Sequence, residues 1–225
     1  MSEVVLVFAT DAQAVADPAL PGDAIVVAAD GGAECALALG LRIDVAVGDF
    51  DSISPAVLEQ LERSGTRIER HPAAKDATDL ELALDAAVAL GPSRVLVVGS
   101  AGGRLDHVLG TLLLIAADAY AGVELDARLG EAIVHVVRDE RTLSGTPGEL
   151  VSLFALHGPA TGVTTSGLVY PLRDETLAVG TSRGCSNVFA EREARVSLTG
   201  GVLLAVRPVS GSATAGSASS SPSAP

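Results

Sequence analysis

The sequence predicts a parallel α/β domain followed by a small all-β domain. Over the first part of the 225-residue chain, apolar strand-like runs alternate with helical patterns across short connections. This alternation predicts a parallel sheet covered by helices on both faces, as in Rossmann-like domains. After about Arg138 the segments become short, rich in Val, Thr and Leu, and separated by Gly, Ser and Pro, which is typical of an antiparallel β-sandwich.

The expected boundaries follow from these changes of pattern. We expect an α/β catalytic domain over residues 1–138 and a β domain over residues 139–209. Residues 210–225 contain only Ser, Ala, Gly and Pro apart from Thr214, so they lack the apolar surface needed to fold. They are predicted to be a disordered tail.

Each element of the first domain has its own sequence signal. Helices are expected from Ala33 to Gly40, where glycine is a common stop, then over 54–63, from Asp79 onward, and over 105–119. Thr78 with Glu81 three residues later matches a capping box. The apolar runs predict strands at residues 4–9, 24–29, 45–47, 66–70 and 94–98.

The second domain shows no helical pattern. Segments rich in β-branched residues, bounded by turn residues, predict strands at 151–155, 162–165, 176–179, 193–198 and 202–206.

Composition narrows the function. Fifteen basic against 28 acidic residues give a net charge of −13, which argues against a nucleic-acid partner because phosphate contacts need Lys and Arg. A phosphorylated small molecule can still bind if a metal supplies positive charge. No apolar run is long enough for a membrane span, and the two cysteines form no CxxC motif. We expect a cytoplasmic protein without a membrane partner.

The segment GDFDS, residues 48–52, follows the predicted strand 45–47. Asp49 and Asp51 are two residues apart, so both carboxylates can point to one side at the carboxyl end of a parallel strand, where such sheets bind ligands. Oxygen ligands in this position suit Mg²⁺ shared with substrate phosphates. The alternative is that Asp51 or Ser52 only caps the following helix.

Three further polar clusters follow other strand ends. Backbone N–H groups at Asp30-Gly31-Gly32 can approach a ligand closely, although two-glycine turns are common. Asp76 and Asp79 share a face if helical, but capping explains part of that segment and leaves Lys75 and Asp76 unexplained. Arg104, Asp106 and His107 follow a Gly-rich turn and, taken singly, could be ordinary surface residues. Clusters after several strands together favour a metal–phosphate site.

In this order and spacing, ADGGA, GDFDS, KDATDLELAL and GSAGGRLDH resemble the thiamine pyrophosphokinase family. The second half continues the resemblance with GVTTSGLVYPL, residues 162–172, and then Ser186-Asn187. The resemblance implies the reaction ATP + thiamine → AMP + thiamine diphosphate with Mg²⁺. It also implies a homodimer whose active sites lie between subunits.

The resemblance also implies roles for single residues. Asp49, Asp51, Asp79 and Asp106 are similar to the acidic catalytic residues that organise the metal and the triphosphate, and the first three are the expected metal ligands. The expected ATP-binding residues are Asp30, Gly31, Gly32, Lys75, Asp76, Arg104 and His107. The expected thiamine-binding residues are Tyr170, which corresponds to an aromatic stacked on the pyrimidine, Ser186 and Asn187.

Two other functions remain open from the sequence. The chain could be a pyrophosphokinase for another hydroxymethyl compound such as a pterin, using a similar metal–phosphate site. It could also be a non-catalytic sensor that binds thiamine or a nucleotide. The segments around Tyr170 and Asn187 argue against the first, and the full set of acidic clusters argues against the second.

Overall fold

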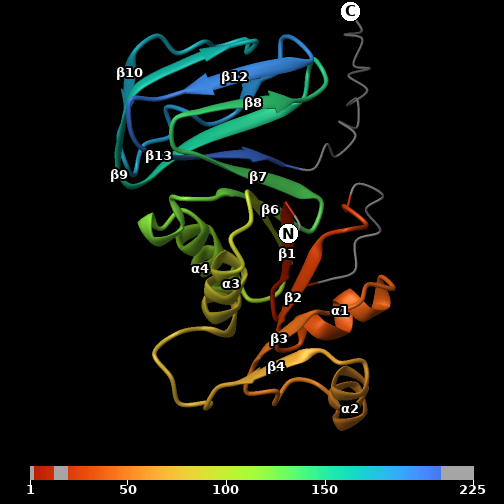
Figure 1. Ribbon diagram of the computed structural model, residues 1–225. Helices are drawn as coiled ribbons and strands as arrows, with labels where there is room; N and C mark the ends of the chain where they lie inside the picture. Colours follow the sequence, from red (N-terminus) through yellow and green to blue (C-terminus); the bar gives the residue numbers. More distant parts are fainter. Residues whose placement is uncertain (1–2, 13–19, 209–225) are drawn as a thin grey trace, which may run out of the picture.

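A computed structural model describes residues 3–12 and 20–208 (Figure 1). The chain forms a lower part, in which helices flank a sheet, and an upper part built of strands. The predicted disordered tail, residues 210–225, lies outside the described residues. Within the described ranges, no helix is long and apolar enough to cross a membrane.

The first part contains a parallel sheet, as the alternating pattern predicts. Its strands are hydrogen-bonded in the order β4-β3-β2-β1-β5-β6, and every neighbouring pair is parallel. These strands are β1 (Val4–Phe8), β2 (Ile25–Ala29), β3 (Val45–Gly48), β4 (Arg67–Arg70), β5 (Arg94–Gly99) and β6 (Glu124–Leu129). The helices are α1 (Gly32–Ala38), α2 (Pro55–Arg63), α3 (Asp79–Ala89) and α4 (Leu105–Ile115).

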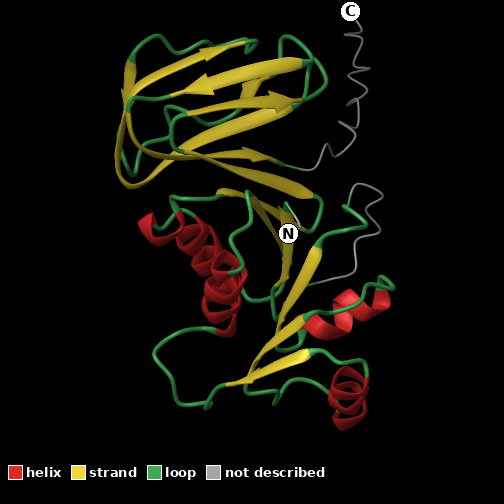
Figure 2. Cartoon of the chain, viewed as in Figure 1, coloured by secondary structure: helices red, strands yellow, loops and turns green. Residues whose placement is uncertain are grey.

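Helices cover both faces of this sheet (Figure 2). Successive residues of a strand point to opposite faces, so β1 places Val5 and Val7 in one core and Leu6 and Phe8 in another. The first core contains side chains of α3 and α4, and the second contains side chains of α1 and α2. The two-sided covering expected from the sequence is therefore present, whereas the comparison with a Rossmann-like domain stays a prediction.

The helix ends have identifiable causes. The hydroxyls of Ser54 and Thr78 accept hydrogen bonds from the backbone N–H groups of Val57 and Glu81, so both residues cap helices. Thr78 caps α3 as predicted, whereas the cap of α2 is Ser54 and not Asp51 or Ser52, so the alternative considered for those two residues is wrong. The helix α4 ends at Ile115, earlier than the predicted residue 119. The carbonyls of Ala116 and Ala117, which follow the helix, accept bonds from the guanidinium of Arg138, and a 3₁₀ turn (Asp118–Tyr120) comes next.

The upper part is antiparallel and encloses its own core. Its strands are β7 (Ala132–Val137), β8 (Glu140–Ser144), β9 (Leu150–Ser166), β10 (Glu175–Leu177), β11 (Asn187–Val188), β12 (Glu193–Ser197) and β13 (Gly200–Arg207). Two predicted strands, 151–155 and 162–165, belong to the single 17-residue strand β9. The layered arrangement is consistent with the expected sandwich, with the boundary expected at residue 138 lying between β7 and β8.

The two parts share one hydrogen-bonded sheet. The strand β7 pairs with β6 on one side and with β13 on the other, and β13 also pairs with β9. The sequence analysis missed β6, β7 and β8. The first two form the junction, whereas β8 pairs with β12 at the other end of the sheet. The parallel sheet therefore passes directly into the antiparallel part.

A buried ion network lies at this junction. Asp126 of β6 is 1% exposed and contacts three cationic or basic side chains from neighbouring strands. Its carboxylate accepts bonds from Arg94 at 2.6 Å and Arg141 at 2.8 Å, and lies 2.9 Å from His135 Nδ1. Burial opposes ionisation, but these partners outweigh it and lower the pKa of Asp126 from 3.8 to about 2.

Candidate active site

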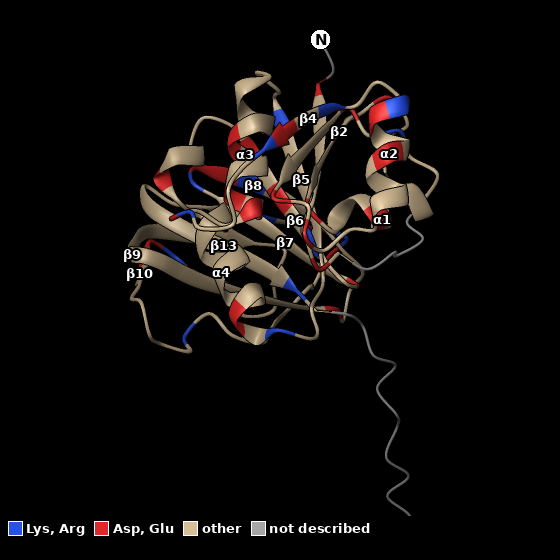
Figure 3. Cartoon of the chain, turned by 90° about the horizontal axis from the view of Figure 1, so that it is seen from below, with Lys and Arg blue, Asp and Glu red and all other residues tan. Residues whose placement is uncertain are grey.

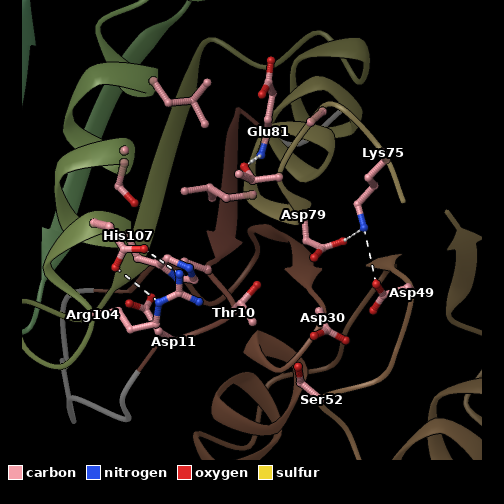
Figure 4. A pocket seen from close by; sticks show the side chains of 18 of the residues that line it. Thr10, Asp11, Asp30, Asp49, Ser52, Lys75, Asp79, Glu81, Arg104 and His107 are labelled. Atoms are coloured by element: carbon pink, nitrogen blue, oxygen red, sulfur yellow. Dashed lines mark hydrogen bonds and ion pairs between the residues drawn. The ribbon is translucent and has the colours of Figure 1, made fainter. Parts of the chain in front are cut away.

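A cavity of about 650 Å³ opens at the carboxyl ends of β1, β2 and β3, between α3 and α4 (Figure 4). This is the edge at which open α/β sheets bind ligands. Figure 3 shows acidic residues on α1 and α3 and in the loops beside them. The polar and charged lining residues are Thr10, Asp11, Asp30, Asp49, Asp51, Ser52, Lys75, Thr78, Asp79, Glu81, Arg104, Asp106, His107 and Thr111.

Three carboxylates meet at one end of the cavity. Oxygen atoms of Asp30, Asp49 and Asp79 lie within 4.8 Å of one another. They come from the end of β2, the end of β3 and the first turn of α3. Gly48 makes this possible, because a Cβ there would lie 3.2 Å from Asp79 Oδ1 and 3.1 Å from Asp30 Cβ.

The backbone at this cluster is strained. Asp30 and Phe50 are non-glycine residues with positive φ angles of 43° and 64°. Such conformations cost about 1–3 kcal/mol each and are concentrated at functional sites. The two loops that carry Asp30 and Asp49 are therefore held in conformations that local preference alone would not select.

Lys75 is the cation of this cluster. Its ammonium lies 3.0 Å from Asp79 Oδ1 and 3.6 Å from Asp49 Oδ2, and its side chain is only 13% exposed. Although burial acts in the opposite direction, hydrogen bonds and charges of Asp79 and Asp49 raise the pKa of Lys75 above its ordinary value. Lys75 therefore stays charged and links two of the three carboxylates.

The cluster fits a hard divalent cation. Asp30 Oδ1 is buried without a hydrogen-bond partner among the described residues, so an acceptor oxygen faces the cluster unused. Burial, together with the charges of Asp79 and Asp49, raises the pKa of Asp30, although the nearby Ser52 and the Gly31 backbone act in the opposite direction. A bound cation would relieve this repulsion, and carboxylate oxygens are the ligands that Mg²⁺ prefers.

The opposite side of the cavity carries the predicted Arg104, Asp106 and His107. Arg104 Nη2 donates to Asp106 Oδ2 at 2.5 Å, and both side chains are largely exposed. Thr10 and Asp11, which the sequence analysis did not single out, also line the cavity. They follow β1 directly, so the strand-end rule that identified the other clusters would have found them.

Not every predicted residue lies in this site. Asp51 lines the cavity but is outside the three-carboxylate group, and it accepts a bond from the hydroxyl of Ser52. Gly31, Gly32 and Asp76 are not among the lining residues. Gly32 has a packing reason, because a Cβ there would lie 2.4 Å from the carbonyl oxygen of Phe8. The predicted ligand roles of these residues stay predictions.

The predicted thiamine-binding residues lie apart, in the β domain. Tyr170 is 61% exposed. Asn187 is buried, and its side-chain amide accepts from the Tyr170 N–H at 3.0 Å and donates to the Tyr170 carbonyl at 2.7 Å. Its amide is therefore used to hold the Tyr170 backbone. Ser186 has a positive φ of 56°, and its N–H donates to the hydroxyl of Ser152.

Comparisons with known proteins cover both parts of the chain. Residues 19–125 match the family model for the thiamin pyrophosphokinase catalytic domain, and residues 131–203 match that for the thiamin pyrophosphokinase vitamin B1 binding domain. Thiamine pyrophosphokinase of Bacillus subtilis is 28% identical over 172 residues, which are 72% of this chain and 77% of the relative. Thiamine pyrophosphokinase 1 of Oryza sativa subsp. japonica is 26% identical over 68% of this chain and 62% of its own length.

Solved structures share the whole fold. The crystal structure of thiamine pyrophosphokinase from Bacillus subtilis superposes with a TM-score of 0.80 at 22% identity, covering 92% of this chain and 99% of the other. A thiamin pyrophosphokinase family protein from Enterococcus faecalis has a TM-score of 0.78 at 27% identity, with the same coverage. The β domain is therefore part of the shared architecture.

A carboxylate cluster with cationic neighbours at the end of a parallel sheet is the arrangement of metal-dependent enzymes that act on phosphate groups. The two family models together extend over most of the chain, and the related structures match both domains. The chain belongs to the thiamin pyrophosphokinase family. The resemblance stated from the sequence is confirmed.

Proposed function

We propose that this chain transfers pyrophosphate from ATP to thiamine, the reaction of its family, and that Asp30, Asp49, Asp79 and Lys75 organise the triphosphate. The observation that carries the proposal is the convergence of three carboxylate oxygens within 4.8 Å, beside a charged lysine. The second family domain, which is named for vitamin B1 binding, favours thiamine over a pterin.

The reaction forms one phosphorus–oxygen bond, breaks another and releases the hydroxyl proton. The primary hydroxyl oxygen of thiamine attacks the β-phosphorus of ATP, and the bond between that phosphorus and the bridging α,β-oxygen breaks. AMP leaves with the bridging oxygen, and the hydroxyl proton passes to a carboxylate or to water. Such transfers depend mainly on in-line positioning and on compensation of the phosphate charge.

The residues around the cavity would have different roles in this transfer. Asp30, Asp49 and Asp79 would hold Mg²⁺, while Asp51 and Asp106 stand where they can orient water or substrate. When bound, Mg²⁺ aligns the phosphate oxygens and neutralises their charge. Lys75 and Arg104 bring fixed positive charge to the same cavity, in which the surrounding acidic residues would otherwise repel a triphosphate.

We propose a homodimer with composite sites. The exposed Tyr170 presents a ring face in the β domain, whereas the lining of the cavity comes from the α/β domain. A second copy that places its Tyr170 beside the cavity would complete the site for thiamine, whose rings suit an aromatic partner. Exposed leucines on α4, Leu105, Leu109 and Leu113, offer apolar surface for such a contact.

We also place the enzyme in the cytoplasm. Both cysteines, Cys35 and Cys185, are free. Free thiols are usual in proteins of reducing compartments.

The test uses the purified chain with ATP, Mg²⁺ and thiamine, and detects thiamine diphosphate and AMP in equal amounts. Asp49→Asn should lower turnover by about 10²-fold without changing the melting temperature much, since one preorganised charge interaction is lost. Glu59→Gln on α2, an exposed carboxylate paired with Arg63, is the matched control and should leave turnover unchanged. ATP hydrolysis without thiamine diphosphate would contradict the proposal.

A further inference from the structure

One face of α4 forms a wall of the cavity. Its lining residues recur with helical spacing and are Asp106, His107, Gly110, Thr111 and Leu114. The residues Leu105, Leu109 and Leu113 occupy a different face and are 79%, 55% and 40% exposed. Gly110 therefore lies at the middle of the wall, where it is exposed to the open cavity.

Neither a backbone torsion nor a contact among the described residues explains why position 110 is a glycine. A glycine inside a helix lowers stability relative to alanine, so one normally has a conformational or packing reason. Gly110 is not among the glycines with positive φ, and a Cβ added there would meet no atom within 4 Å beyond its own helix. Gly32 of α1 differs, because its Cβ would collide with the Phe8 carbonyl.

We propose that Gly110 is a specificity-determining residue that keeps the wall open for the nucleoside of the phosphate donor, an inference that rests on the proposed function. The phosphate groups would bind at one end of the cavity, beside the carboxylate cluster and Lys75. The apolar lining lies along α3 and α4 and at the end of β1, and includes Leu80, Leu114 and Ala9. A planar base approaches bare helix backbone at Gly110 more closely than any side chain would allow.

The test separates nucleoside contact from phosphate contact. Gly110→Ala should raise the melting temperature by about 2 °C through helix propensity, yet weaken ATP and AMP binding several-fold. Gly110→Leu should weaken both by about 10-fold or more, because a larger side chain fills the same space. Binding of inorganic triphosphate with Mg²⁺, and the KM for thiamine, should stay as in the parent, since neither involves the nucleoside.

Gly122→Ala is the matched control, because this position also has open space around it but lies outside the cavity lining. Its ATP affinity should equal that of the parent. Unchanged ATP affinity in Gly110→Leu would overturn the inference, and so would an equal loss of inorganic triphosphate binding or a loss confined to thiamine. Failure of the proposed function is recognised separately, because the parent itself would then form no thiamine diphosphate.

Discussion

Lys75 balances the charge of the acidic cluster. It contacts Asp79 and Asp49 directly, and these two carboxylates lie close to Asp30. Lys75→Met should lower the free energy of unfolding of the metal-free protein by about 1–2 kcal/mol, or about 4 °C in melting temperature, because the carboxylates then repel one another. Thermal melts with EDTA measure this change.

The same variant should gain more from a divalent cation. Added Mg²⁺ should raise the melting temperature of Lys75→Met more than that of the parent, since the cation replaces the missing charge. Lys75→Arg keeps the charge and serves as the control. If Lys75→Met melts like the parent in EDTA and in Mg²⁺, Lys75 does not stabilise the cluster.

At the level of residues, the sequence locates the site well but does not determine which carboxylates meet. Strand-end placement identified Asp49, Asp79 and Arg104 because it depends only on local pattern. It placed Asp51 with the metal ligands, whereas the structure groups Asp30 with Asp49 and Asp79. The difference arises from backbone torsions at Asp30 and Phe50 that no periodicity encodes.

Among elements, the side-chain contacts that connect β5, β6, β7 and β8 depend on Asp126. Its folded pKa of about 2 lies below the ordinary 3.8, so its ionised form stabilises the fold above about pH 4. This contribution, about 2 kcal/mol, is lost as pH falls from about 4 through 2. Asp126→Asn should therefore lower stability at neutral pH by about 3 kcal/mol, because Arg94 and Arg141 lose their buried counter-ion.

Denaturant unfolding at pH 7 and at about pH 3 tests this prediction. The difference in stability between parent and Asp126→Asn should shrink at the lower pH. At about pH 3 the carboxyl of Asp126, with a folded pKa of about 2, stays mostly ionised in the folded parent but binds a proton on unfolding, which removes part of the stabilisation. Asp118→Asn removes a carboxylate that is 95% exposed and should change little at either pH. A constant difference between parent and Asp126→Asn would show that shape, not charge, matters at this position.

Sequence patterns predicted the elements unevenly. Strands buried on both faces, such as β1 and β2, read as apolar runs and are found within one residue of their predicted ends. The strands β6, β7 and β8 mix apolar residues with Arg, Glu and His, because the buried ion network places charged residues inside the sheet. A search for runs of apolar residues does not detect such strands.

For the whole molecule, subunit mixing tests the composite site. Tyr170→Ala should raise the KM for thiamine several-fold and leave that for ATP nearly unchanged, since an exposed ring contributes to binding and not to packing. At low thiamine, an equal mixture of the weakened Tyr170→Ala and Asp49→Asn should exceed the mean of the two separate variants by up to about a quarter of parental activity, because half the dimers are mixed and carry one intact site.

The double variant, Tyr170→Ala with Asp49→Asn, is the control for this mixing. Combined with either single variant it leaves no intact composite site and should restore nothing. If each site lies within one subunit, mixing the two single variants gives no recovery. Prior unfolding and joint refolding of the two chains allow the subunits to exchange.

The unbroken sheet also determines how this molecule can move. A rotation of the upper, β-stranded part against the lower part would break the hydrogen bonds that join β7 to β6, including the pairing of His135 with Asp126. We infer that each chain keeps a fixed angle between its two domains throughout the catalytic cycle. Entry of ATP and release of AMP then depend on connecting loops, such as residues 71–78 with Lys75, and not on bending between domains.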